Sequence, residues 1–210
     1  MQKKERYLGI TDYFQQAMPD AQTELHYDSP YQLLVAVMLS AQCTDKRVNM
    51  TTPALFQAFP TSKDLANATF DEVYQLIRSI SYPNSKAQHL IGMAQMLESD
   101  FMGEVPSTLE QLTRLPGVGR KTANVVMSVA FGKSTMAVDT HVFRVSHRIG
   151  LVPPRCTTPL SVERELVRNI PPHLIHSFHH WLILRGRYVC KAIHPDCANC
   201  GIRRWCLSAK

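Results

Sequence analysis

A nine-residue run from Leu115 to Ala123 constrains the fold of this chain more than any other stretch. It reads Leu-Pro-Gly-Val-Gly-Arg-Lys-Thr-Ala, and apolar residues recur after it at helical spacing until Gly132. We predict two helices joined by a five-residue hairpin over residues 107–132, in which Gly117 and Gly119 permit positive φ and a close approach of the backbone to a ligand. Arg120 and Lys121 open the second helix at the positive end of its dipole, where cations are disfavoured. Residues that break a local rule mark a candidate functional site.

The hairpin has the features of an anion site. The N–H groups of the turn and of the following helix have no partner within the helix, and they point at whatever docks there. Such donors hold a phosphate without reading a base sequence. The alternative is a plain turn between two helices, which a bare Gly-x-Gly would favour. The charge around this one favours the anion site.

Helical periodicity recurs in the other interpretable segments. Thr69-x-x-Glu72 and Ser107-x-x-Glu110 are predicted capping boxes, Ser85 is a predicted cap, and Leu33–Leu39 forms a buried apolar run. Hairpin dipeptides between alternating apolar runs are missing from the sequence. We therefore predict an all-α fold, with a domain boundary near residue 133, where the composition becomes basic.

Size and composition indicate a globular protein. The chain has 210 residues, of which 45% are hydrophobic, and its longest apolar run is too short to span a bilayer. The first six residues lead into no apolar segment of the kind found in secretory signals. We expect an intracellular protein with no membrane partner.

The positive charge is concentrated in two segments. The net charge is +6, and residues 114–155 contain seven basic residues and one acid, Asp139. Residues 185–210 contain six basic residues and one acid, whereas the rest of the chain has ten bases and fifteen acids. A solvated basic face would explain either segment alone. Both together favour a nucleic acid partner.

Four of the six cysteines lie in the last 21 residues, with the spacing C-x6-C-x2-C-x5-C; they are Cys190, Cys197, Cys200 and Cys206. In an intracellular chain such a group more often binds metal than forms disulfides. Zinc and an iron–sulfur cluster both suit four thiolates. Zinc sites commonly pair two C-x2-C units, and only one is present here, which slightly favours iron–sulfur.

Lys121 and Asp139 are the candidate catalytic residues. The helix dipole disfavours the ammonium form of Lys121, and a neutral amine is a nucleophile that can form a Schiff base. Arginine stays protonated, so Arg120 cannot take this role, although Lys121 could equally be a second phosphate cation. Asp139 precedes a helical pattern and is a predicted N-cap, and an ionised carboxylate there could also stabilise a cationic sugar.

A group of histidines is a weaker signal. It comprises His173, His176, His179 and His180. No acid lies among them and no His-Glu-x-x-His motif is present, so we interpret them as packing or surface residues rather than as a metal site.

Together these motifs resemble the iron–sulfur branch of the helix–hairpin–helix DNA-repair glycosylase superfamily. Besides the hairpin and the cysteines, the resemblance rests on Leu39-Ser40-Ala41-Gln42-x-Thr44-Asp45, Asn84-Ser85-Lys86-Ala87, Glu104-Val105-Pro106, Val138-Asp139-Thr140-His141-Val142-x-Arg144-Val145 and His179-His180-Trp181-Leu182-x-Leu184-x-Gly186-Arg187-Tyr188-x-Cys190. It extends from about Leu33 to Cys206, nearly the whole chain.

The resemblance implies a two-lobed helical protein. Residues 23–133 would form a six-helix domain that contains the hairpin, and residues 1–22 with 134–210 an iron–sulfur domain. The four cysteines would hold a 4Fe–4S cluster. The partner would be double-stranded DNA with a damaged base or an abasic site, bound by a monomer.

The resemblance also implies the chemistry and the site residues. Lys121 would be the nucleophile and Asp139 its partner in a bifunctional glycosylase and AP lyase acting on oxidised or ring-saturated pyrimidines, which cuts on the 3′ side by β-elimination. Gln42 would fill the space left by the flipped base. The implied DNA contacts are Gln42, Tyr82, Leu115, Gly117, Val118, Gly119, Arg120, His141, Arg144 and Lys191.

One segment departs from the family pattern. The family commonly has glycine, an aliphatic residue and tyrosine before Asn-x-Lys-Ala, whereas this chain has Ser81-Tyr82-Pro83. Tyr82 would be either a half-buried residue of a Pro-Asn turn or an aromatic wedge that stacks on the unpaired strand.

Two other functions remain open from the sequence. One is a monofunctional mismatch glycosylase, although related adenine-mismatch enzymes lack the lysine and carry an extra C-terminal domain, whereas this chain ends four residues after Cys206. The other is a non-catalytic iron–sulfur DNA-binding protein, in which Lys121 and Asp139 would be replaceable.

Overall fold

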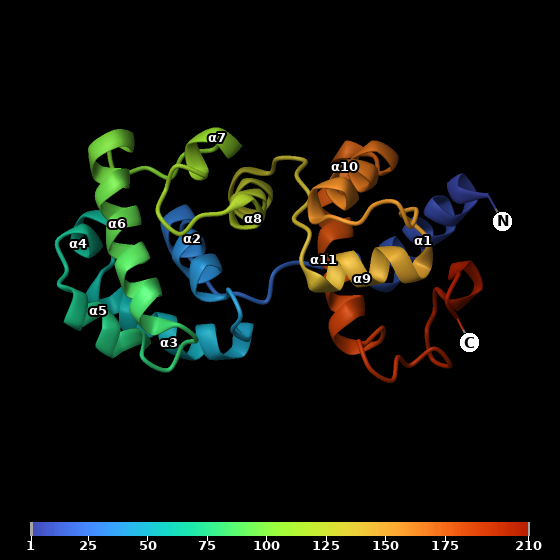
Figure 1. The fold of residues 1–210 in the computed structure, drawn as a ribbon, viewed down its shortest axis with the longest axis horizontal. Coiled ribbons are helices and arrows are strands. Elements are labelled where there is room, and N and C mark those ends of the chain that lie inside the picture. Colours follow the sequence, from blue (N-terminus) through green and yellow to red (C-terminus); the bar gives the residue numbers. More distant parts are fainter. Residues whose placement is uncertain (1, 210) are drawn as a thin grey trace. The chain divides into compact units, whose positions relative to one another are not determined.

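The computed structural model describes residues 2–209, and it confirms the predicted all-α fold. These residues form α-helices and two short 3₁₀ helices, and no strand occurs among them (Figure 1). None of the helices in that range has the length and apolar character needed to cross a membrane. The chain divides into two compact units: Glu24–Gly132 is one, and the residues up to Thr23 together with those from Lys133 onward form the other.

The unit of residues 24–132 is built around a buried central helix. Its helices are α2 (Pro30–Leu39), α3 (Asp45–Ala58), α4 (Ser62–Ala66), α5 (Phe70–Ile77), α6 (Pro83–Phe101), α7 (Leu109–Leu112) and α8 (Arg120–Phe131). Residues 33–39 of α2 are all buried, as a continuous apolar run requires. Helices α3, α6 and α8 contact α2, and α6 also packs along α4 and α5 (Figure 1). The packing fixes the loops at the ends of α2, α5 and α7.

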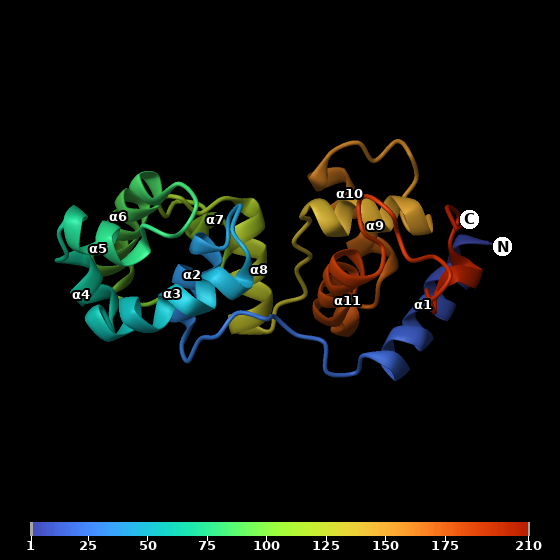
Figure 2. The same ribbon diagram turned by 90° about the horizontal axis from the view of Figure 1, so that it is seen from below.

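The second unit combines the two ends of the chain. Its helices are α1 (Lys3–Ala17), α9 (Thr140–Ile149), α10 (Pro159–Asn169), η1 (Pro172–Leu174), α11 (Ile175–Tyr188) and η2 (Arg203–Trp205). Helix α11 lies beside α9 (Figure 2). The rings of Phe14, Phe178 and Trp181 are buried and in mutual contact, so α1 and α11 share one core.

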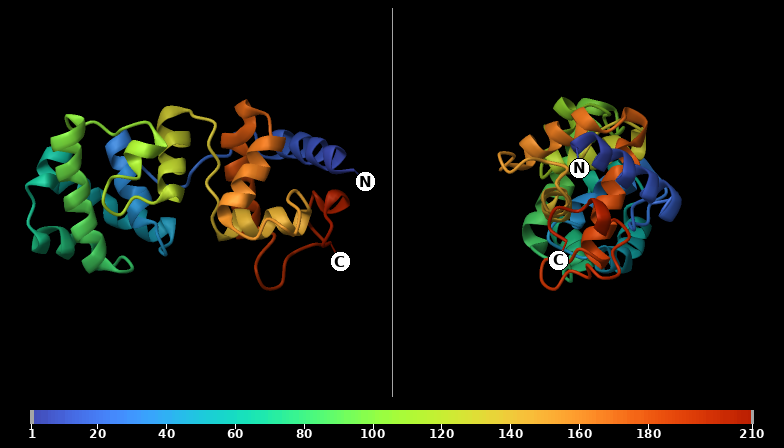
Figure 3. Two further views of the ribbon diagram at one scale, coloured as in Figure 1. Left: turned by 45° about the horizontal axis from the view of Figure 1, so that its top comes forward. Right: turned by 90° about the vertical axis from the view of Figure 1, so that its right-hand side faces the viewer.

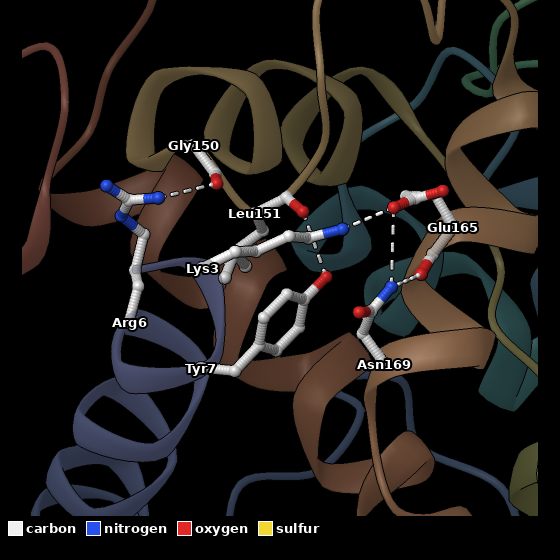
Figure 4. Close-up of polar contacts among 7 residues, drawn as sticks. All are labelled: Lys3, Arg6, Tyr7, Gly150, Leu151, Glu165 and Asn169. Atoms are coloured by element: carbon white, nitrogen blue, oxygen red, sulfur yellow. Dashed lines mark hydrogen bonds and ion pairs between the residues drawn. The ribbon is translucent and has the colours of Figure 1, made fainter. Parts of the chain in front are cut away.

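Polar contacts also connect α1 to residues of the same unit that follow Lys133 in the sequence (Figure 4). The buried Arg6 donates from Nε to the carbonyl of Trp205 at 2.8 Å and from Nη1 to that of Gly150 at 3.1 Å. Lys3 forms an ion pair with Glu165 of α10. A buried guanidinium is stable only when its donors are paired, so these carbonyls specify the position of the first helix.

The helix starts were predicted with mixed success. The capping box of Thr69 and Glu72 is confirmed at the start of α5. The box predicted at Ser107 is wrong by one residue, because Thr108 caps α7 and accepts a hydrogen bond from the backbone N–H of Gln111. Both registers are present in the sequence, and spacing alone does not choose between them.

The predicted cap at Ser85 is also wrong. The N-cap of α6 is Tyr82, three residues before the predicted cap, and the helix begins at Pro83. Proline is favoured at the first position of a helix because its fixed φ suits the helix and its missing N–H costs nothing there.

Candidate active site

The predicted helix–hairpin–helix is formed by α7, the hairpin and α8. The N–H of Val118 donates to the carbonyl of Leu115 at 3.1 Å, and both side chains are buried. These two predicted DNA-contact residues therefore have only main-chain atoms to offer a partner. Gly132 ends α8 in the left-handed conformation, as predicted.

The two hairpin glycines differ in conformation. Gly117 uses the positive φ that glycine permits, with φ +76°, and a Cβ there would lie 2.7 Å from the Cβ of His89. Gly119 is the N-cap of α8 with φ −87°, so it does not use the positive φ that glycine permits. A Cβ on Gly119 would meet nothing within 4 Å. No contact within the described residues thus explains the glycine at 119, which leaves open space in front of the helix.

Arg120 and Lys121 occupy the first turn of α8, and both are exposed. No side chain caps this helix end, and its first turn contains no acid. Backbone donors and two cations thus occupy one helix N-terminus, where the dipole already favours an anion.

An open cavity of about 220 Å³ brings together Gln42, Tyr82 and Gly117, three of the predicted DNA-contact residues. Its other lining residues are Met38, Ala41, Ser85, Lys86, His89 and Leu90. The cavity lies entirely within the unit of residues 24–132.

Gln42 and Tyr82 both have left-handed backbone conformations, with φ of 53° and 56°. Non-glycine residues adopt this region at a cost, and such strain concentrates at functional sites. The Ser81 hydroxyl donates to the Gln42 carbonyl at 2.7 Å and so joins the two loops. Tyr82 is 64% exposed, so the expectation of a half-buried tyrosine is wrong.

Lys86 is a positioning residue that we did not predict. Its side chain is buried, and Nζ donates to the carbonyls of Leu39 at 2.8 Å and Ala41 at 2.7 Å. Burial lowers the pKa of Lys86. The lysine belongs to one of the motifs that carried the family resemblance, but its burial depends on α6 packing against the end of α2, which is not visible in the sequence.

Asp139 lies in the other unit from Lys121. It is the N-cap of α9, as predicted, and its Oδ1 accepts a hydrogen bond from the N–H of Val142 at 2.7 Å. The side chain is half-buried. This bond fixes the carboxylate at the start of a helix, where a negative charge is stabilised by the dipole.

His141 and Arg144 follow on α9. His141 packs closely on α11, since a Cβ on Gly186 would lie 2.8 Å from the Cβ of His141. Arg144 donates from Nη2 to the carbonyls of Gly186 at 2.9 Å and Cys190 at 3.1 Å. Arg144 therefore connects α9 with the start of the cysteine segment. Lys191, the next residue, is exposed.

The four clustered cysteines line one cavity. They belong to the C-terminal segment that follows α11 and runs largely as a loop (Figure 3). Their thiols are free, and Arg185 and Arg203 also line the cavity. Arg148 lies beside it, with Nη1 3.6 Å from the Cys190 sulfur. Burial, reinforced by the nearby Cys190 and Cys200, raises the pKa of the Cys206 thiol.

Cysteine thiolates are the ligand type that both zinc and iron–sulfur clusters take. In residues 2–209 no three potential ligands are close enough to hold a single metal ion. Zinc would need four sulfurs at about 2.3 Å from one centre. Four free thiols with Arg185 and Arg203 on the same cavity are a donor set that suits a negatively charged iron–sulfur group.

The histidine group differs in burial from one end to the other. His173 is exposed on η1, whereas His179 and His180 are buried in α11. Burial, together with the neighbouring His179, His176 and Arg187, lowers the pKa of His180 to about 2. His180 is therefore a neutral residue of the core near neutral pH.

Comparison with known proteins assigns the family. Residues 35–172 match the model of the HhH-GPD superfamily of base excision DNA repair proteins. Endonuclease III of Rickettsia felis is 47% identical over 197 residues, which cover 94% of this chain and 92% of that protein. Endonuclease III of Escherichia coli is 41% identical over 203 residues, covering 97% and 95%.

A solved structure agrees with this assignment. The structure of a trapped endonuclease III–DNA covalent intermediate with an estranged adenine has a TM-score of 0.93 and 42% identity, and it covers 100% of this chain and 98% of that one. The chain belongs to the HhH-GPD superfamily, and within it to the endonuclease III family. Its activity is that of a DNA glycosylase and AP lyase in base excision repair.

Proposed function

We propose that this enzyme removes oxidised or ring-saturated pyrimidines from double-stranded DNA, with Lys121 as the nucleophile and Asp139 as its catalytic partner. The observation that carries the proposal is the start of α8. There, the exposed Lys121 lies two residues after Gly119, whose missing side chain leaves the approach to the helix open. Arginine beside it cannot lose its proton, so only Lys121 can supply a neutral amine.

The proposed reaction begins with a damaged nucleotide turned out of the duplex. The lone pair of Lys121 Nζ attacks C1′, the N-glycosidic bond breaks, and the departing base takes the bonding electrons and a proton. Opening of the sugar gives a Schiff base between Nζ and C1′. Loss of a proton from C2′ then expels the 3′ phosphate, and water finally hydrolyses the Schiff base and frees the lysine.

Asp139 has the charge that this sequence of steps needs. Positive charge develops on the sugar as the base leaves, and an ionised carboxylate stabilises it. The hydrogen bond from the N–H of Val142 holds the carboxylate in place at the start of α9. Asp139 would also help to keep the attacking amine neutral by accepting its proton.

Gly117, Gly119 and Arg120 are proposed to bind the DNA backbone at the N-terminus of α8. His141, Arg144 and Lys191 are proposed contacts from the other unit, and for Arg144 the contact must coexist with its bonds to two carbonyls. We propose that the two units act as the two domains of a monomer that works on the chromosome inside the cell.

We propose that Cys190, Cys197, Cys200 and Cys206 hold a 4Fe–4S cluster. The group would supply no step of the reaction and would instead fix the C-terminal segment, whose apolar side chains are few. Brown protein with about four iron and four sulfide atoms per chain is the expected result. Colourless protein that contains zinc would contradict the assignment.

The substrate class is tested with duplexes that carry thymine glycol, an 8-oxopurine or no lesion. We expect free thymine glycol and a strand cut on the 3′ side from the first duplex only. Base release without a cut would indicate a monofunctional glycosylase. Binding without base release, even by protein with its full cluster, would indicate a non-catalytic DNA-binding protein.

A further inference from the structure

Arg185 of α11 is a buried cation at the cysteine cavity. Its side chain lines the cavity, and the residue is only 7% exposed. Its Nε is buried and has no hydrogen-bond partner among residues 2–209. We propose that Arg185 is the counter-ion of the bound iron–sulfur cluster, to which Nε donates a hydrogen bond, and that Tyr13 of α1 positions it. This role rests on the proposed function, which assigns the cluster to the four cysteines.

The charge of Arg185 has no acidic partner within the described part of the chain. Burying a charge is unfavourable unless the charge is paired and hydrogen-bonded. The ion pairs of the described residues join Lys3 to Glu165 and Arg114 to Asp100, and neither includes Arg185. Asp196 is the one acid among the described residues that line the cavity, and its carboxylate accepts hydrogen bonds from Asn199. The compensating negative charge must therefore come from what the cavity binds.

An iron–sulfur cluster would supply that negative charge. The four thiolates carry more negative charge than the oxidised core carries positive charge, so the cluster with its ligands is an anion. Hydrogen bonds to the sulfur atoms are one of the means by which a protein sets the reduction potential of such a cluster. The N–H of Arg185 Nε is a donor of this kind.

The backbone of Arg185 is bonded to the first cysteine of the cluster motif. Its carbonyl accepts hydrogen bonds from the N–H of Cys190 at 2.7 Å and from that of Val189 at 3.0 Å. These bonds lie where α11 ends at Tyr188 and the cysteine segment begins. The guanidinium and the first thiol are therefore held by the same turn of the chain.

Tyr13 fixes the guanidinium from α1. Arg185 Nη2 donates to the Tyr13 hydroxyl at 3.4 Å, and the guanidinium carbon lies 5.5 Å and 5.4 Å from the ring centroids of Tyr13 and Phe14. Aromatic rings attract a cation but do not neutralise it. A Cβ on Gly201, the residue after Cys200, would overlap the Tyr13 hydroxyl, so α1 packs directly against the cysteine segment.

The other arginines at the cavity are placed differently. Arg203 lines the cavity but is exposed, so water screens its charge. Arg148 lies beside the Cys190 sulfur and also donates to the carbonyls of Lys191 and Ala192. Arg185 is the arginine whose burial makes its charge depend on the cluster.

The test uses holoprotein whose iron and sulfide contents are measured first, and the visible absorbance then reports the loss of the cluster to an iron chelator. Arg185→Met should lose the cluster at least about tenfold faster than the wild type, as loss of one charged hydrogen bond predicts. Tyr13→Phe, which lacks only the hydroxyl, should lose it about threefold faster. Arg164→Met changes an exposed arginine of α10 in the same unit and should behave like the wild type.

The reduction potential of the cluster separates a counter-ion from a residue that only supports the fold. Reduction makes the cluster more negative, so Arg185→Met should lower the potential, whereas Arg185→Lys keeps the charge and should stay closer to the wild type. An unchanged rate of cluster loss in Arg185→Met, or faster loss with an unchanged potential, would overturn the proposal.

Tyr13→Phe decides the case in which Arg185→Met is isolated without a cluster. A rate of cluster loss in Tyr13→Phe equal to that of the wild type would then overturn the proposal, and a faster rate would support it. Failure of the proposed cofactor would be seen separately, as wild-type protein that contains zinc in place of iron and sulfide.

Discussion

At the scale of single residues, the two glycines of the hairpin are required for different physical reasons. Gly117 needs a left-handed backbone and has His89 packed against it, so its small size serves the fold. Gly119 has an ordinary φ and open space around it. The absence of a side chain at 119 therefore serves close approach of a ligand to the backbone.

Two alanine substitutions separate these reasons. Gly117→Ala should lower the free energy of unfolding by about 1–3 kcal/mol, because a left-handed alanine is strained and its Cβ overlaps His89. Gly119→Ala should change it by less than about 1 kcal/mol, since the entropy gain and the poorer cap oppose each other. Urea denaturation measures both changes in the free energy of unfolding.

The same substitution at 119 tests the phosphate site. We expect Gly119→Ala to weaken DNA binding at fixed salt by at least about tenfold. Equal Kd values for Gly119→Ala and wild type would contradict the phosphate-site assignment.

His180 makes stability depend on pH. Its pKa falls from 6.5 to about 2 on folding, so between these values the unfolded chain binds a proton that the folded chain does not. The free energy of unfolding should therefore decrease as the pH falls below 6.5. From pH 7.5 to 5.5, the wild type should lose about 1 kcal/mol more than His180→Leu. His173→Leu serves as the exposed control and should behave like the wild type; identical losses in all three proteins would show that His180 is not the group responsible.

At the scale of elements, Lys86 connects α6 to the end of α2. The last carbonyls of a helix lack partners within the helix, and the ammonium satisfies that of Leu39, the last residue of α2, and also that of Ala41 just beyond the helix. The loop that carries Gln42 begins there, so the same contacts position a predicted DNA-binding residue. Ser81 adds a bond to the Gln42 carbonyl from the loop that precedes α6.

Replacing this lysine should therefore affect both stability and the neighbouring loop. Lys86→Met should cost about 1–3 kcal/mol, because the buried carbonyl of Leu39 and the part-buried carbonyl of Ala41 both lose a donor. Lys63→Met removes an exposed lysine of α4 in the same unit and should cost less than about 0.5 kcal/mol. Thermal or urea unfolding compares the two, and equal effects would argue against a structural role for the Lys86 ammonium.

Local patterns predicted most of the elements but not all of their boundaries. The chemistry of single residues predicted that Gly132 ends α8 and that Asp139 caps α9. Both predictions are correct. The caps at Thr108 and Tyr82 were misplaced by one and three residues, because Thr108 competes with Ser107 as a cap and α6 starts at Pro83 without a side-chain cap. The buried ammonium of Lys86 and the carbonyl contacts of Arg144 depend on segments more than 40 residues apart, which periodicity does not report.

At the scale of the whole molecule, the sequence motifs are distributed over two units with separate tasks. The unit of residues 24–132 contains the hairpin, Lys121 and the cavity, and the other contains Asp139 and the cysteines. Motif spacing identified the family and the candidate chemistry. It did not predict that Gln42, Tyr82 and Gly117 line one cavity with Ser85 and His89, since that grouping arises only when α2, α6 and the hairpin pack together.

The central claim is that Lys121 forms a Schiff base with the sugar, and borohydride trapping tests it most directly. Wild-type protein incubated with a duplex containing an abasic site and borohydride should give a covalent protein–DNA adduct, because the reagent reduces the imine to a stable amine. Lys121→Gln should give none, whereas Lys63→Gln should give as much as the wild type. An adduct of undiminished yield in Lys121→Gln, or none with the wild-type protein, would contradict the account.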